Sequence, residues 1–324
     1  MKAMHDATAV GTRLNGLFQP GFSSDQKIVI DVLQQHPTPG VFAVGQEPLI
    51  DIGDGRALQA SEDDGNADFH SRFFNRHGFV LLDHESEVQN WDSGAFGATD
   101  RFGDQSKQYA EVENEVAKFY MPEIEAILQN TLLPGKRIEI QQPDRLLRRG
   151  KHSPNPFFGT VVHNDYGMTP DDFEENSAAF GNPEHAAEWR KQFDRDDVTG
   201  FMVVNFWRTV HMHQPLQHMP LGVLDASTVE RDDVVSSGLK GFTMSGQITN
   251  QSSLRYNKGQ RWYYYPRMTT NEVLALNLFE CHKDDDGTMV YNTYHSAFEE
   301  PFPANDVEER ESCEHRVSVF LLKD

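Results

Sequence analysis

Short apolar runs separated by turn residues dominate the chain from about residue 136 onward, and one more such run lies at 79–83. Runs of about four to eight residues rich in Val, Ile, Phe and Tyr, bounded by Gly, Pro, Asn or Asp, are typical of β-strands. The pattern predicts strands at 79–83, 137–140, 159–163, 200–207, 261–265, 273–279, 289–294 and 315–322. Many short strands with turns between them favour a mainly β sandwich or jelly roll.

Helical spacing of apolar residues appears in two places. One is Ser106 to Asn130, a predicted helix that Pro122 bends or restarts. The other begins at Thr169, where a capping residue is followed by Pro170 and acidic residues, and it continues with a second predicted helix at 183–193. We expect this helical insert, at about 169–199, to be a lid beside the mouth of the β structure.

The hydrophobic and polar pattern divides the chain into two parts. Residues 1–66 are weakly patterned and predict an irregular arm with short strands, packed on the core. Residues 67–324 predict a single β domain with flanking helices. The two cysteines, Cys281 and Cys313, fall in predicted strands, and we expect both to be reduced because a domain of this size needs no disulfide.

The chain is strongly acidic. Its 324 residues carry 50 Asp and Glu against 29 Lys and Arg, a formal net charge of −21. Such a charge repels nucleic acid and anionic lipid, so we expect a small-molecule partner and neither a nucleic acid nor a membrane. The sequence has no apolar run of the length of a membrane helix and no signal-peptide pattern at residue 1, so we expect a cytoplasmic protein. A homodimer stays open as an assembly.

Two His-x-acid tripeptides occur, which is about the number that chance supplies in this composition. His282-Lys283-Asp284 falls in an acidic stretch typical of a solvated hairpin turn. His163-Asn164-Asp165 ends a predicted strand, where residues i and i+2 point to the same side. His163 and Asp165 can therefore both face the interior of the β structure.

A third metal ligand is available at His295, at the edge of a late strand. Two histidines and one carboxylate on one face of Fe(II) leave positions open for a co-substrate and oxygen. The last predicted strand adds alternate polar residues that can share one face: Arg310, Ser312, Glu314, Arg316 and Ser318. A buried arginine requires an anion, and the dicarboxylate 2-oxoglutarate would provide a bidentate partner.

These motifs together resemble the Fe(II)/2-oxoglutarate-dependent oxygenases, and more narrowly the gibberellin desaturase-like and cephem methoxylase subunit-like hydroxylase/desaturase group. The resemblance runs from about residue 70 to the end. It implies a double-stranded β-helix core, a cupin-like jelly roll, with Fe(II) held by His163, Asp165 and His295. It also implies 2-oxoglutarate and O2 as co-substrates, and oxidation of an unactivated C–H bond of a small molecule by hydroxylation, desaturation or oxidative cyclisation in specialised metabolism.

Several assignments stay open at this point. Arg310 with Ser312, or Arg316, can hold the co-substrate, and the spacing from His295 favours Arg310. Tyr166, Arg208 and Tyr264 are candidate substrate residues. Arg208 can equally form a strand-end ion pair, and Tyr264 can equally belong to the core.

Two other functions also stay open. One is an iron-dependent oxidase that does not use 2-oxoglutarate. The other is a non-catalytic accessory subunit that binds a small ligand, because family resemblance alone does not guarantee activity.

Overall fold

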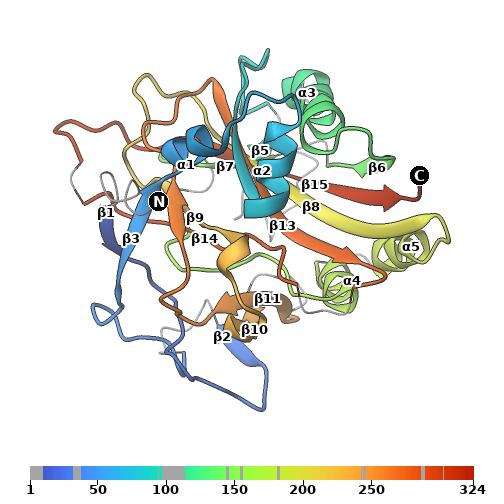
Figure 1. The fold of residues 1–324 in the computed structure, drawn as a ribbon, viewed down its shortest axis with the longest axis horizontal. Helices are drawn as coiled ribbons and strands as arrows, with labels where there is room; N and C mark the ends of the chain where they lie inside the picture. The colour runs from blue at the N-terminus through green and yellow to red at the C-terminus, as the bar shows by residue number, and fades with distance from the viewer. Residues whose placement is uncertain are drawn as a thin grey trace.

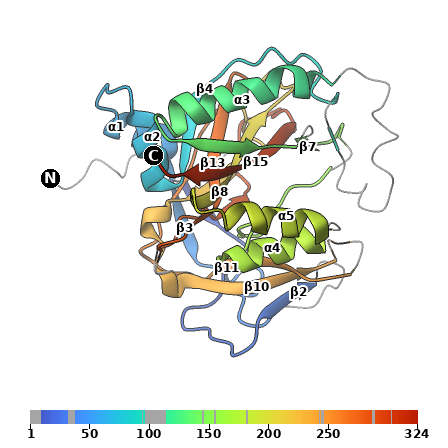
Figure 2. The same ribbon diagram turned by 90° about the vertical axis from the view of Figure 1, so that its right-hand side faces the viewer.

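The computed structural model describes residues 10–324 apart from 32–37, 94, 97–113, 144–145, 154–155, 181–182, 242, 244–245, 286–288 and 302. Two walls of β-structure face each other, and α3 (Met121–Ile127) covers the outside of the larger wall, whereas α4 (Pro170–Ala179) and α5 (Pro183–Phe193) lie against its inner side (Figures 1 and 2). No helix in the described part of the chain is long and apolar enough to cross a membrane.

The larger wall is a seven-stranded sheet with the order β4-β13-β8-β15-β7-β5, and β6 also pairs with β15. Its strands are β4 (Phe79–Asp83), β5 (Ala95–Phe96), β6 (Ile138–Gln141), β7 (Leu146–Arg149), β8 (Val198–Thr209), β13 (Glu272–His282) and β15 (Ser312–Leu322). The long central strands β8, β13 and β15 pair antiparallel. Alternate residues of β15 therefore face opposite sides of the sheet.

One side of this sheet is apolar and packs against helices. Val317 and Val319 of β15 are fully buried in a cluster with residues of α2 (Phe69–His77) and α3 (Met121–Ile127). The other side carries the polar residues of β15, among them Glu314 and Arg316, and faces the second wall. The outer face is thus apolar, and the inner face is polar around Glu314 and Arg316 and apolar at its other end, where Phe201, Phe279 and Phe320 are buried against α5.

The second wall is built from two smaller sheets, with the orders β1-β3-β12-β9-β14 and β11-β10-β2. Their strands are β1 (Val10–Arg13), β2 (Ile28–Asp31), β3 (Leu49–Asp54), β9 (Leu221–Leu224), β10 (Val234–Lys240), β11 (Thr249–Leu254), β12 (Trp262–Tyr264) and β14 (His295–Ala297). The segment 161–164 bridges them, because His163 pairs with His295 of β14 and Asn164 pairs with Ser252 of β11. The first 66 residues contribute β1, β2, β3 and the helix α1 (Gly55–Glu62).

The helical predictions agree with the structure where it describes them. Residues 116–132 form one continuous helical stretch, with π-helical turns η2 (Val116–Tyr120) and η3 (Leu128–Leu132) on either side of α3, whereas 106–113 lie outside the described residues. Pro122 lies inside this stretch, just after the π-helical turn η2, so its missing N–H falls where the stretch changes from π-helical to α-helical bonding. The insert forms α4 (Pro170–Ala179), which Thr169 caps, and α5 (Pro183–Phe193).

Aromatic contacts seat the insert against the large sheet. The ring of Phe173 in α4 lies 4.7 Å from that of Trp189 in α5, 4.7 Å from Phe201 of β8 and 5.5 Å from Phe279 of β13. The insert is therefore anchored by its core contacts and is not a loop hanging over the β structure.

Most strand predictions are confirmed by β4, β6, β8, β12, β13 and β15. The strands predicted at 159–163 and 289–294 are wrong. Within 289–294 the backbone bonds go to different neighbours: Thr293 N donates to Asn277 O, and Tyr294 O accepts from Leu224 N. Cys281 and Cys313 are buried and free, as expected.

Candidate metal centre

The segment that carries His163 is held by three different neighbours. Val162 N donates to Asn15 O, and His163 exchanges both backbone hydrogen bonds with His295. Asn164 N donates to Ser252 O. This pairing places His163 beside His295 and leaves Asp165 just past the last bridge, so the three predicted ligands come together from positions 132 residues apart in sequence.

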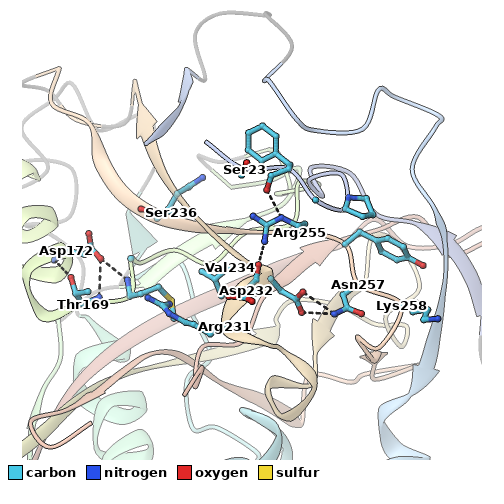
Figure 3. A pocket seen from close by; sticks show the side chains of 18 residues that line it. Ser23, Thr169, Asp172, Arg231, Asp232, Val234, Ser236, Arg255, Asn257 and Lys258 are labelled. Atoms are coloured by element: carbon cyan, nitrogen blue, oxygen red, sulfur yellow. Dashed lines mark hydrogen bonds between the residues drawn. The ribbon is translucent and has the colours of Figure 1, made fainter. Parts of the chain in front are cut away.

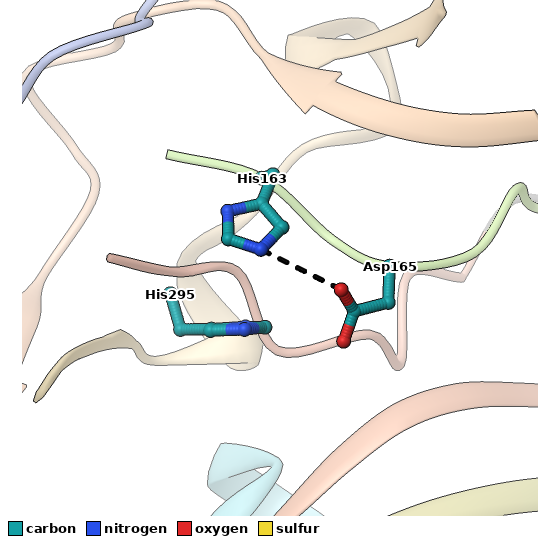
Figure 4. Close-up of side chains that lie close together, drawn as sticks. All are labelled: His163, Asp165 and His295. Carbon is teal, nitrogen blue, oxygen red and sulfur yellow. Dashed lines mark ion pairs between the residues drawn. The ribbon is translucent and has the colours of Figure 1, made fainter. Parts of the chain in front are cut away.

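His163, Asp165 and His295 converge on one point (Figure 4). One ligand atom from each residue lies within 4.8 Å of the others. His163 Nε2 is 3.5 Å from Asp165 Oδ1, and the two imidazole ring centres are 4.6 Å apart. Among the described residues this is the one group of three or more His, Cys, Asp or Glu side chains close enough to share a metal ion.

Backbone carbonyls orient both imidazoles. His163 Nδ1 is 2.6 Å from Val161 O, and His295 Nδ1 is 3.2 Å from Thr293 O. A carbonyl can only accept, so each Nδ1 carries a proton, and the neutral form of each ring would present the electron pair of Nε2 to a metal. The second hydrogen bond of a ligating histidine usually fixes its tautomer in this way.

The electrostatics favour the ligating form of two of the three donors, an ionised Asp165 and a neutral His295, whereas His163 is shifted toward its protonated form. Burial alone would raise the pKa of Asp165, but the charge of Arg316 and the hydrogen bond to His163 hold it well below its usual range. Burial, with the charge of His163, lowers the pKa of His295 to about 4. Burial would also lower the pKa of His163, but its bond to Asp165 outweighs burial and raises it. An ionised carboxylate beside a neutral imidazole suits a divalent cation, and the set of two histidines and one carboxylate fits Fe(II).

A chain of alternating charges extends from Asp165 along the inner face of the large sheet. Arg316 Nη2 lies 3.1 Å from Asp165 Oδ2 and 3.5 Å from Glu314 Oε1. Arg149 Nη2 of β7 lies 3.2 Å from the same Glu314 oxygen, and Asn205 Nδ2 donates to the other one at 3.5 Å. Arg316 is thus already paired with two carboxylates.

Arg310 has a different environment. Its side chain is buried, its Cζ lies 3.9 Å from the ring centre of Phe158, and one of its N–H groups donates to Met219 O. Within the described structure it forms no ion pair, and both its Nε and the Oγ of Ser312 are buried without a hydrogen-bond partner. Burial and the neighbouring Arg149 lower the pKa of Arg310 to about 9. These orphaned donors are suited to an anion.

The other predicted residues lie in different places. Tyr166 follows the ligands directly and stacks on Phe173 with ring centres 5.6 Å apart, and burial raises its pKa to about 12. Arg208 lies on the outer side of β8, where its Cζ is 4.8 Å from the ring centre of Trp91. Tyr264 packs on Phe298 and donates to Glu300, on the side of β12 opposite to His295.

Two residues of the interior were missed as site candidates. Tyr263, not Tyr264, shares the sheet face of His295, because both pair with Val223 of β9. Arg149 pairs in register with Ser312, which puts it on the inner face beside Arg310. Both placements depend on strand register, which a single sequence does not specify.

One cavity lies outside the group of His163, Asp165 and His295. It measures about 1050 Å³ and opens between the N-terminal segment around Phe22, the start of α4 and the strand β10 (Figure 3). Its polar groups bond to one another: Arg255 Nε donates to Phe22 O, and Asn257 Nδ2 donates to Asp233. The cavity has no metal-ligand geometry of its own among its described residues.

Comparison with known proteins shows which family and which relatives the chain is similar to. A family model described as an oxidoreductase/YMDC permease-like domain matches residues 63–320. The hydroxylase/desaturase asaB of Aspergillus flavus is 28% identical over 133 residues, which cover 38% of this chain and 56% of asaB. The Fe(II)/2-oxoglutarate-dependent dioxygenase nvfI of Aspergillus novofumigatus is 27% identical over 120 residues, 37% of this chain and 41% of nvfI. The chain spans about half the length of the curated relatives it matches, and their names confirm the resemblance to the hydroxylase/desaturase group.

The fold has a match among solved structures. The structure of the iron and alpha-ketoglutarate-dependent endoperoxidase NvfI superposes with a TM-score of 0.60 at 18% identity, over 97% of this chain and 99% of that one. The likeness confirms the predicted fold class, a mainly β chain with flanking helices around a jelly-roll core.

Proposed function

This chain belongs to the oxidoreductase/YMDC permease-like domain family, and from that premise we propose that it is an Fe(II)/2-oxoglutarate-dependent oxygenase. The observation that carries the proposal is the convergence of His163, Asp165 and His295 with their ligand atoms within 4.8 Å. The substrate is a small molecule that is hydroxylated, desaturated or cyclised at an unactivated C–H bond. We place the reaction in the cytoplasm.

Each residue of the proposed site has its own role. His163 and His295 each present Nε2, because Nδ1 is engaged by a backbone carbonyl, and Asp165 presents Oδ1 on the same side. Iron bound there supplies oxygen chemistry that no side chain can perform. Tyr166 and the helical insert limit access of water from one side of the ligands. The protein's part is position and a dry interior.

For the co-substrate we assign the distal carboxylate of 2-oxoglutarate to Arg310 and Ser312. The support is that Arg310 Nε and Ser312 Oγ are buried without partners in the described structure, whereas Arg316 is paired with Asp165 and Glu314. Arg149 Nη1 is a third orphaned donor in the same region. A carboxylate here would satisfy all three donors.

The activity is tested by anaerobic reconstitution with Fe(II), followed by 2-oxoglutarate, oxygen and a panel of amino acids, peptides and terpenoids, with mass detection of succinate and products. His163→Ala and Asp165→Ala should abolish succinate release. His282→Ala changes the other His-x-Asp tripeptide, where His282 pairs with Glu280, and should leave release unchanged. Succinate formation that survives Asp165→Ala would rule out the proposal.

The co-substrate assignment has its own test. Arg310→Met should raise the KM for 2-oxoglutarate about 10- to 100-fold, since hydrogen bonds to a charged group contribute about 1.5–3 kcal/mol. Ser312→Ala should raise it less. An unchanged KM in Arg310→Met would exclude Arg310 as the anchor.

A further inference from the structure

The two oxygens of Asp165 face different partners. Oδ1 is 3.5 Å from His163 Nε2, on the side where the ligand atoms converge, and Oδ2 is 3.1 Å from Arg316 Nη2. Rotation of the carboxylate about its last bond would exchange the two oxygens unless something holds one of them. Arg316 is the group that holds it.

Arg316 is itself held by a second carboxylate, that of Glu314. Its Nη2 is 3.5 Å from Glu314 Oε1, and Glu314 is in turn clamped by Arg149 at 3.2 Å and by Asn205 at 3.5 Å. Arg149 and Asn205 lie on β7 and β8, the two strands that flank β15. The position of the guanidinium is therefore set by three neighbouring strands of the large sheet, while Asp165 lies on the opposite wall.

We propose that Arg316, backed by Glu314 and Arg149, is a positioning residue that limits Asp165 to one metal-facing oxygen. The inference rests on the proposed function. With Oδ2 held by Arg316, Asp165 would offer a bound metal Oδ1 alone, and two histidines with one such oxygen would leave room on the metal for the co-substrate and oxygen. Partners behind a ligand typically change metal affinity about 10- to 100-fold when they are removed. Arg316 thereby has a role distinct from that of Arg310.

The test uses Co(II) as the probe, without turnover. We compare wild type with Arg316→Met, which removes the guanidinium, and Arg316→Lys, which keeps the charge. Arg195→Met is the control, because Arg195 also pairs with two carboxylates, Glu139 and Asp197, on the surface. Calorimetry gives the Co(II) dissociation constant and the affinity for 2-oxoglutarate, and the visible spectrum of bound Co(II) reports its coordination.

Arg316→Met should raise the Co(II) dissociation constant about tenfold or more and change the spectrum, whereas Arg195→Met should do neither. Arg316→Lys should give an intermediate result. If Arg316→Met fails to fold, Glu314→Gln removes the backing charge and should shift the spectrum in the same direction. Wild-type Co(II) affinity and spectrum in the variants, or a loss confined to 2-oxoglutarate, would overturn the inference. If wild type binds Co(II) but releases no succinate with Fe(II), the proposed function fails while this test still decides the role of Arg316.

Discussion

Arg208 shows how strand alternation decides a residue's role. It follows Trp207, whose side chain faces the interior near Arg310, so Arg208 faces the helices. There its guanidinium donates to the carbonyls of His84 and Thr270 and lies against the rings of Trp91 and Tyr120. Of the two roles that the sequence left open, the surroundings favour a structural one, although among the described residues no acidic side chain forms an ion pair with Arg208.

Arg208→Ala should therefore lower the free energy of unfolding by about 3 kcal/mol, because it leaves a cavity and two unsatisfied carbonyls. Urea denaturation measures the loss, and the Co(II) affinity of the folded variant should equal that of wild type. Arg72→Ala is the matched control: Arg72 is half exposed and pairs with Asp64 and Asp68, so its loss should cost less than about 1 kcal/mol. A stable Arg208→Ala with a raised KM for substrate would restore the anchor role.

At the scale of residues the sequence predicted the grouping of His163, Asp165 and His295 better than their surroundings. His163 and Asp165 are separated by one residue, so a local rule puts them on one side. Arg149, by contrast, joins Glu314 only because β7 pairs with β15 in one particular register. A shift of that register by one residue would turn Arg149 outward, and nothing in a single sequence fixes it.

The helix α4 begins a few residues after Asp165, and its N-terminal cap bonds to the backbone of the segment between them. Thr169 Oγ1 accepts from Asp172 N at 3.1 Å, and Asp172 Oδ2 accepts from the backbone N of Met168 and of Thr169. Thr169→Ala should reduce the free energy of unfolding by about 1 kcal/mol in urea titrations. Thr169→Ser keeps the hydroxyl and should retain most of the stability of wild type. An equal loss of unfolding free energy in the two variants would mean that the methyl group of Thr169, and not its capping hydroxyl, stabilises the helix.

The helix α1 is tied to β13 by Arg56 and Glu272, whose N–O distances are 2.6 and 2.9 Å. Burial would raise the pKa of Glu272, but the hydrogen bonds from Arg56 and Thr269 outweigh it and lower the pKa. A carboxyl with a depressed folded pKa stabilises the protein above the unfolded pKa, near about 4.3, and loses that contribution as the pH falls through the folded pKa.

Glu272→Gln should thus lower the free energy of unfolding by about 1–2 kcal/mol at pH 7, an effect that is limited because Arg56 is half exposed. The difference in unfolding free energy between variant and wild type should shrink below about pH 4. Urea midpoints at pH 7 and pH 3.5 measure it. Asp51→Asn, at an exposed position of β3, is the control and should change stability by less than about 0.5 kcal/mol at either pH. A difference that grows in acid would contradict the sign.

At the scale of elements the sequence fails where the backbone changes partners. Long strands such as β8 keep the same neighbours throughout, and their apolar runs were recognised. The segments 159–163 and 289–294 have similar runs, yet their hydrogen bonds go to several separate segments, among them Asn15, His295 and Ser252 for the first. Both segments include or adjoin the proposed metal ligands, so the irregular backbone lies next to the side chains that it orients.

For the molecule as a whole, charge is divided between outside and inside. The chain carries −21, but the polar interior holds Arg149, Arg310 and Arg316 against the two carboxylates Asp165 and Glu314. Its local charge is therefore positive, and a bound Fe(II) would add to it. A dianion such as 2-oxoglutarate is repelled by the surface at long range and attracted only after entry.

The association rate of 2-oxoglutarate with the metal-loaded protein should consequently rise with ionic strength, by about threefold or more between about 10 and 100 mM salt. Over this range the Debye length falls from about 30 to about 10 Å. Screening weakens the distant repulsion of the surface more than the contact between the carboxylate and buried Arg310. Stopped-flow absorbance at several salt concentrations gives the rate, and pyruvate, with one charge, should show about half the logarithmic slope. A rate that falls with salt would mean that the positive interior, rather than the net charge, governs the approach of the anion.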